Sequence, residues 1–147
     1  MTVLQWTGEF RIDHGTMDEI HVEFVELLNA LGAAEEDMVL SALDDFVAHT
    51  ERHFADEEAW MADCAFPRIH CHTQQHGAVL QVAREVRVRM AAGETTLAPL
   101  LVTAVGAWFR EHVATMDLML ANCMTGQGYV PRAEMRRPER SPVGRRG

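Results

Sequence analysis

Apolar residues recur at every third or fourth position through most of the chain, which is the spacing of helices that bury one face. The pattern predicts four helices of roughly twenty residues each, joined by short loops. Their expected starts lie near Met17 or Asp18, in the acidic run 35–37, near Pro67 and after Thr96, and their expected ends near Gly32, Met61, Ala91 and Leu120. Pro67 marks either a break or the first turn of the third helix. The fourth helix is expected to turn Leu100, Leu101 and Val105 inward.

Helices of this length with short connections predict an all-α, up-down-up-down antiparallel four-helix bundle over residues 1–125. Residues 1–16 are expected to form an extended arm, with Trp6, Phe10 and Ile12 available to pack and Gly8 and Gly15 as helix breakers. Residues 126–147 are rich in Arg, Pro and Gly and have no apolar period. We therefore expect a disordered, flexible tail there.

Charge separates these two parts of the chain. The net charge is −9 overall, but the tail carries six arginines against two glutamates, whereas the first 125 residues carry seven arginines against twenty acidic residues. An acidic body repels nucleic acid and anionic lipid, so neither is an expected partner. No apolar run is long enough to span a membrane.

Length and cysteine content indicate the number of domains and the expected compartment. At 147 residues and 48% hydrophobic, the chain suffices for one domain with a core. Residues 1–10 lack the basic and apolar regions of a secretory signal. The three cysteines, at positions 64, 71 and 123, form no C-x-x-C pair and indicate no disulfide framework. These features predict a location in the reducing cytoplasm.

Two histidine-containing pairs carry the chemistry. His53 with Glu57, and His72 with His76, are each four residues apart, so each pair lies on one face of its helix. Imidazole and carboxylate ligands together suit iron, zinc, copper or nickel better than calcium or magnesium. A single histidine on an apolar face is more often a packed core residue than a ligand, but two such pairs on consecutive helices favour a metal site.

Seven side chains are expected to converge at one level of the bundle. Ligand candidates alternate between early and late positions on successive helices, and antiparallel neighbours bring such positions together. The seven candidates are His21, His53, Glu57, His72, His76, His112 and Asp117. Seven ligands are too many for one tetrahedral zinc and fit two octahedral metals, with Glu57 and Asp117 available as bridges. Five histidines then divide as three and two and leave an open position on the two-histidine metal; iron is the most plausible ion.

The residues at these positions resemble the hemerythrins, and within them the bacteriohemerythrins, from about Trp6 to Met124. The matching segments are Met17-Asp18-Glu19-Ile20-His21 with Leu28-Asn29, His53-Phe54-x-x-Glu57-Glu58-x-x-Met61, Phe66-Pro67, His72-x3-His76 and Trp108-x3-His112-x4-Asp117. The resemblance implies that His72, His76 and His112 bind one iron and that His21 and His53 bind the other. It implies that Glu57 and Asp117 bridge them, together with an oxo or hydroxo ion.

The resemblance further implies reversible dioxygen binding at a non-haem di-iron centre, as in an oxygen carrier, storage or delivery protein. An apolar surround that includes Phe24, Leu28 and Trp108 fits a carrier, which needs no acid aimed at the bound gas. Dioxygen is thus the expected partner, with an unidentified protein recipient, and catalysis is the less favoured reading. The alternatives are a di-iron peroxidase, oxidase or nitric oxide reductase on the same ligands, or an oxygen sensor.

Three histidines lie outside the ligand set. His14 and His70 fit no ligand position and are expected on the surface or in the arm. His49 lies one turn before His53, where relatives commonly have tyrosine, and is the candidate proton donor of the enzyme alternative.

The spacing of His112 and Asp117 predicts an irregularity in the fourth helix. Five residues at about 100° each place these two side chains about 140° apart on a regular α-helix. Either a π-type bulge lies between them or they straddle the inward face, and straddling is the preferred expectation.

Overall fold

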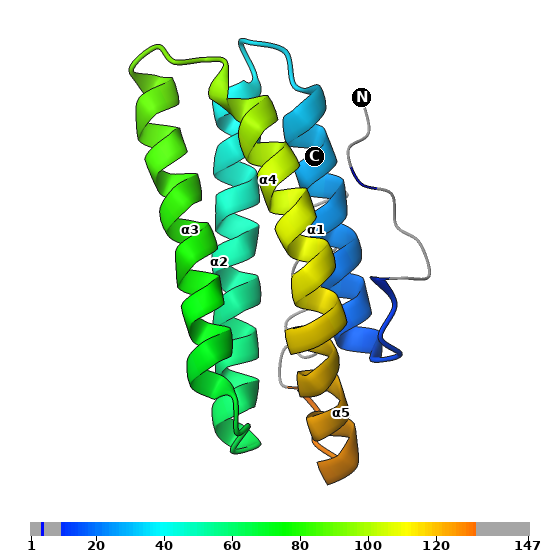
Figure 1. Ribbon diagram of the computed structural model, residues 1–147. Coiled ribbons are helices and arrows are strands. Elements are labelled where there is room, and N and C mark those ends of the chain that lie inside the picture. Colours follow the sequence, from blue (N-terminus) through cyan, green and yellow to red (C-terminus); the bar gives the residue numbers. More distant parts are fainter. Residues whose placement is uncertain (1–3, 5–9, 132–147) are drawn as a thin grey trace.

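Four helical rods lie side by side in the computed structural model, which describes Leu4 and residues 10–131 (Figure 1). The elements are α1 (Gly15–Ala33), α2 (Val39–Asp63), α3 (Ile69–Ala91) and α4 (Leu97–His112), which continues through the π-helical turn η2 (Val113–Asp117) into α5 (Leu118–Gln127). Helix α1 packs against α2 and α4, and α3 packs against the same two helices. The predicted all-α, up-down-up-down bundle is confirmed.

Helix α1 begins at Gly15, two to three residues before its expected start, because side chains satisfy backbone groups in and just before its first turn. The imidazole of His14 accepts a hydrogen bond from the Met17 backbone N–H at 3.3 Å. The carboxylate of Asp18 accepts hydrogen bonds from the backbone N–H groups of Ile12 (3.0 Å) and His14 (3.3 Å). Gly15 is therefore the first residue of the helix and not a breaker.

The N-terminal arm packs on the bundle wherever the structure describes it. The Leu4 backbone N–H donates to Oδ1 of Asn29 on α1 at 3.0 Å, and Nδ2 of Asn29 donates back to the Leu4 carbonyl. Leu4, Phe10 and Ile12 are all buried in the core. Trp6, which was also expected to pack, lies outside the described residues.

The loops between helices differ in detail from the sequence expectation. Gly32 does not end α1, which continues to Ala33 without a left-handed residue. Pro67 lies in the loop before α3 and not in its first turn. Gly93, at φ 114°, follows α3 in a conformation that L residues with a side chain rarely adopt.

The helix faces follow most of the apolar pattern, and Leu100 departs from it. Leu100 was expected to face inward but is 67% exposed, whereas Leu101 is 3% exposed. Adjacent residues are about 100° apart around a helix, and the inward face of α4 is set by Leu101, Val105 and Phe109. Among the residues that the structure describes, no helix combines the length and apolarity needed to cross a membrane.

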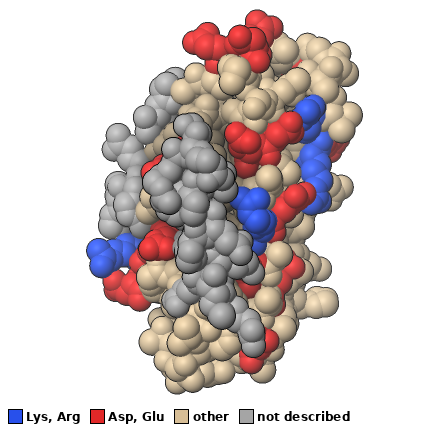
Figure 2. Space-filling view, turned by 180° about the vertical axis from the view of Figure 1, so that it is seen from behind, with Lys and Arg blue, Asp and Glu red and all other residues tan. Residues whose placement is uncertain are grey.

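Ion pairs join the outer surfaces of neighbouring helices. Arg84 and Arg87 on α3 pair with Glu51 (2.7 Å) and Asp44 (2.6 Å) on α2. On the face shown in Figure 2, arginine side chains lie beside acidic ones. Such exposed pairs contribute little each to stability, so the buried core carries most of the folding free energy.

The C-terminal end of the bundle extends past the boundary predicted at residue 125. Helix α5 ends at Gln127, capped by Gly128 at φ 67°. The Gln127 amide donates to the Cys64 carbonyl at 2.9 Å, and the Tyr129 hydroxyl donates to the Asp63 carboxylate at 2.6 Å. Gln127 and Tyr129, from the part expected to be a tail, thus contact the end of α2 and the residue that follows it. Residues 132–147 lie outside the described part of the chain.

Candidate metal centre

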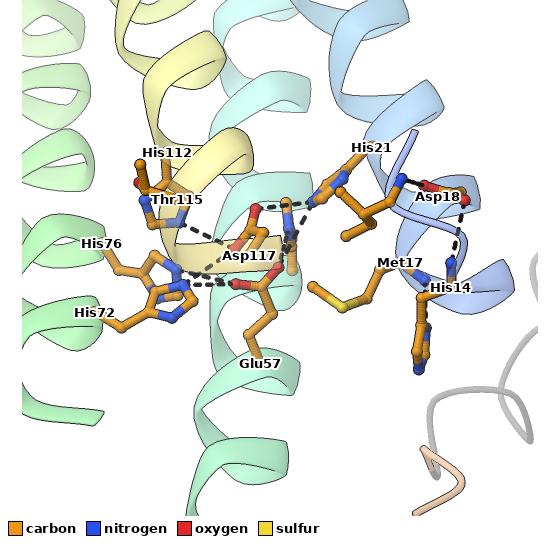
Figure 3. A network of polar contacts seen from close by, with 12 residues as sticks. His14, Met17, Asp18, His21, Glu57, His72, His76, His112, Thr115 and Asp117 are labelled. Carbon is orange, nitrogen blue, oxygen red and sulfur yellow. Dashed lines mark hydrogen bonds and ion pairs between the residues drawn. The ribbon is translucent and has the colours of Figure 1, made fainter. Parts of the chain in front are cut away.

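The seven candidate ligands come together at one level of the bundle, from α1, α2, α3, α4 and η2 (Figure 3). Each of the seven is 3% exposed or less. Glu57, His72, His76, His112 and Asp117 form one group whose donor atoms lie within 4.8 Å of one another; His21, His53, Glu57 and Asp117 form a second. The two groups share both carboxylates and divide the five histidines as three and two.

Glu57 directs one carboxylate oxygen to each group. Its Oε1 lies 3.2 Å from Nε2 of His72 and 3.1 Å from Nε2 of His76. Its Oε2 lies 2.7 Å from Nε2 of His53 and 3.7 Å from Nε2 of His21. One carboxylate therefore faces two separate clusters of imidazole nitrogens, as a bridging ligand does.

Asp117 repeats this division. Its Oδ1 lies 3.1 Å from Nε2 of both His72 and His112, and its Oδ2 lies 3.1 Å from Nε2 of His21. Two carboxylates from different helices thus span the same two clusters. This arrangement gives the three-histidine half five protein donor atoms and the two-histidine half four.

The spacing of the donor atoms fits metal ions. Neighbouring ligands at about 2.1 Å from an octahedral ion lie ~3 Å apart, close to the 3.1–3.2 Å separations above. Hydrogen bonds do not account for these contacts, because most of the facing atoms make none. The atoms without a hydrogen bond include Nε2 of His21, His72, His76 and His112, Oε1 of Glu57 and both oxygens of Asp117. Buried polar atoms without partners are costly, and a bound cation would satisfy all of them.

A π-helical turn places Asp117 on the same face as His112. The segment Val113–Asp117 is π-helical between two regular α-helices. Hydrogen bonds from residue i to i+5 bring side chains five positions apart into line along the helix. The preferred expectation that the two side chains straddle a regular helix was therefore wrong, and the alternative of a π-type bulge is confirmed.

Two polar residues to which the sequence assigned no role hold two histidines of the larger group. Oε1 of Gln75 contacts Nδ1 of His112 at 2.6 Å, and Oε2 of Glu58 contacts Nδ1 of His76 at 3.0 Å. A proton on Nδ1 donated to these oxygens leaves the Nε2 lone pair directed into the site. Both residues adjoin a ligand in sequence, which was the available signal, but their partners lie on another helix.

Aromatic rings surround the imidazoles on both sides. Phe54 stacks on His76 at 3.8 Å between ring centroids, and Trp108 stacks on His112 at 4.3 Å.

Beside the two-histidine half, Phe24 and Phe109 stack on each other at 4.3 Å. Phe109 meets His21 edge-on, and Phe24 meets His53 in the same manner. The rings fix the orientation of the imidazoles and keep this half of the site apolar.

The charges within the cluster shift the pKa values of its members. Burial alone lowers the pKa of His21 and His72, but the close negative carboxylates of Asp117 and Glu57 outweigh burial and raise both values to about 9. Burial raises the pKa of Glu57, but the charge of His53 and its close contacts with His53, His21 and His72 hold it well below its usual range. The pKa of Asp117 is likewise lowered, so both carboxylates are ionised, as metal ligands must be.

The other histidines lie outside this cluster. His14 is half-buried and caps α1, and His70 is exposed on α3, as expected. His49 is 7% exposed, its ring centroid lies 5.8 Å from that of His53, and its Nδ1 lies 3.8 Å from Oε1 of Glu23. It is therefore adjacent to the two-histidine half without belonging to either donor group.

Comparison with known proteins gives one consistent family. The family model described as the hemerythrin HHE cation binding domain matches residues 14–123. A bacteriohemerythrin of Ralstonia nicotianae is 43% identical over 134 residues, which covers 91% of this chain and 98% of the relative. A bacteriohemerythrin of Stenotrophomonas maltophilia is 29% identical over 126 residues, covering 83% and 82%.

Solved structures give the same fold. A crystal structure of wild-type hemerythrin superimposes with a TM-score of 0.76, and a crystal structure of a mutant hemerythrin with 0.78. The sequence identities are 21% and 22%, and the matched regions cover 82% and 84% of this chain and 97% and 98% of the structures. At this identity the superposition bears on the fold alone.

Proposed function

Because the chain belongs to the hemerythrin family, we propose that it binds dioxygen reversibly at a non-haem di-iron centre formed by the seven converging side chains. In this proposal His72, His76 and His112 hold one iron, His21 and His53 hold the other, and Glu57 and Asp117 bridge the two. The observation that carries the proposal is that each carboxylate directs one oxygen to each histidine group.

The protein donors leave the two halves unequal. The three-histidine half has five protein donors and the two-histidine half has four, so an ion held by His21, His53 and the two carboxylates would be the one with more room for an outside ligand. When bound, the iron pair supplies the electrons and the open position that reversible binding of dioxygen requires. The Phe24 and Phe109 rings meet His53 and His21 edge-on, and this apolar surface would disfavour water beside an ion held there.

The test is anaerobic loading with ferrous iron, followed by exposure to air in a spectrophotometer. A carrier should gain a visible absorption band that disappears when oxygen is removed and returns on re-exposure, with two irons per chain. Immediate irreversible oxidation, or stoichiometric zinc in protein prepared with ample iron, would contradict the proposal.

A di-iron enzyme on the same ligands is the second candidate, and the position of His49 favours it. The His49 ring is next to His53, and its Nδ1 faces the partly exposed carboxylate of Glu23. A buried imidazole between a surface acid and the two-histidine half is suited to move protons, which cleavage of an oxygen–oxygen bond requires. Sustained turnover of peroxide or nitric oxide by the iron-loaded protein would support this candidate over the carrier.

A further inference from the structure

The two halves of the site differ in how their histidines are held from outside. In the three-histidine half, His76 and His112 each have Nδ1 in contact with an oxygen of another helix, whereas Nδ1 of His72 has no hydrogen-bond partner among the described residues. In the two-histidine half, neither Nδ1 of His21 nor Nδ1 of His53 has a hydrogen-bond partner among the described residues. The difference does not follow from burial, since all four side chains are almost fully buried.

The outer contacts form a chain across three helices. Glu58 on α2 reaches His76 on α3, and Gln75, the residue before His76, reaches His112 at the end of α4. Each contact fixes one tautomer and one ring orientation, with Nε2 facing the donor group. Phe54 and Trp108 restrain the same two rings by stacking. Two of the three histidines of this half are therefore held with Nε2 facing the donor group before any ion arrives.

We propose that Gln75 and Glu58 are positioning residues that preorganise the three-histidine half, so that this half takes up the first metal ion and the two-histidine half takes up the second. The inference rests on the proposed di-iron site. Binding to a preorganised group costs less conformational entropy, and contacts of this kind contribute ~10–100-fold to metal affinity. The larger donor count of this half acts in the same direction.

Anaerobic titration of the metal-free, full-length protein with Co²⁺ tests the order of loading, because cobalt reports its coordination in the visible spectrum. The wild type should bind two ions in two phases, the first tighter than the second. His21→Ala should keep the tight phase and lose the weak one, whereas His112→Ala should lose the tight phase. Equal affinity for both ions in the wild type, or the reverse assignment of phases, would overturn the inference.

The positioning role is tested by matched substitutions at the two outer residues. Gln75→Leu and Glu58→Leu remove the acceptor oxygen and should weaken the first phase ~10–100-fold, with a smaller effect on the second. Gln75→Glu and Glu58→Gln retain an acceptor oxygen and should preserve the first phase. Gln74→Leu, one residue away and exposed, is the control and should leave both phases unchanged.

The outcomes separate this inference from the proposed function. Unchanged titrations of the two leucine variants, or an equal loss in Gln74→Leu, would remove Gln75 and Glu58 from the metal site while leaving the di-iron proposal intact. A wild-type protein that takes up fewer than two ions would contradict the di-iron proposal itself. Circular dichroism of the metal-free variants checks that affinity, and not folding, has changed.

Discussion

At the scale of single residues, the two carboxylates that both donor groups share distinguish the proposed site from two independent metal sites. Because Glu57 faces both histidine groups, Glu57→Ala should lose both metals, whereas His21→Ala should lose only one. Metal content per folded chain, measured by mass spectrometry after reconstitution with iron, checks this. His70→Ala, on the exposed side of α3, is the control. One iron retained after Glu57→Ala would show that Glu57 serves a single ion.

The histidines that face these carboxylates predict how the metal-free protein responds to pH. The pKa values of His21 and His72 are raised to about 9 in the folded chain, so their stabilising effect is complete below the unfolded value of 6.5. That effect is lost as the pH rises through about 9. The lowered pKa values of Glu57 and Asp117 have the opposite effect on the pH dependence of stability. The stabilising contribution of these carboxylates is present above their ordinary pKa values and is lost as the pH falls.

The metal-free protein should therefore be most stable between about pH 5 and 6.5, with a lower melting temperature at pH 9. Metal binding should show the reverse trend on the alkaline side, because the ion must displace protons from His21 and His72. Calorimetric titration with metal at pH 7, in two buffers of different ionisation enthalpy, should reveal about two protons released per chain. Proton release near zero would contradict the charged state of these histidines.

His49 decides between the carrier and the enzyme. Because its ring adjoins His53 while Glu23 lies on its outer side, we expect His49→Phe to retain two irons and to lengthen the lifetime of the oxygenated form. The lifetime is followed by the decay of the visible band in air-saturated buffer. An unchanged lifetime would mean that His49 only packs against Phe24, and the loss of one iron would make it a ligand.

At the scale of elements, the π-helical turn η2 matters because it sets the direction of the Asp117 side chain. Residues four apart share a face on an α-helix, and residues five apart share a face across a π turn. Deletion of the exposed Ala114 should therefore let the segment become α-helical with His112 and the aspartate still in line. The shortened protein should keep two metals.

Insertion of one alanine after Ala114 should have the opposite result, since the aspartate would then lie six positions after His112 and turn away from the site. We expect this protein to lose both metals, with most of its helicity retained by circular dichroism. If the deletion also abolishes metal binding, the π turn itself is required, and not only the shared face of the two ligands.

At the scale of the whole molecule, the bundle ends later than the apolar pattern indicates, and this defines a safe truncation. A chain ending at Pro131 should keep its iron and any oxygen binding, because none of the seven candidate ligands lies in residues 132–147. Removing residues 128–147 should also leave the metal site intact but lower the melting temperature. The loss follows from the Tyr129–Asp63 hydrogen bond, which contributes ~1 kcal/mol.

Thermal unfolding of the two truncated proteins beside the full chain measures the difference. Tyr129→Phe in the full-length protein is the matched control, because it removes the hydroxyl and keeps the ring. Loss of iron from the chain that ends at Pro131 would show that residues 132–147 contribute to the site.

Much of the fold could be predicted from periodicity, because the helix-forming signal is local. Residues three and four apart share a face, so the inward position of His53 with Glu57, and of His72 with His76, follows from their spacing alone. The alternation of early and late candidates then brings the seven side chains to one level in any antiparallel bundle. Leu100 shows the limit of this reasoning, because this apolar residue lies at the edge of the inward face of α4 and is exposed.

The sequence by itself thus determined the four helices, the identity of the converging side chains and their division between helices. Only the tertiary structure decided which oxygen of Glu57 and Asp117 faces which histidine. It also decided that the π-helical turn η2 brings Asp117 onto the face of His112, and that Gln75 and Glu58 contact His112 and His76. The reason is physical. Periodicity reports which face of a helix is buried, whereas these contacts depend on the axial offset and rotation of one helix against another, which packing alone fixes.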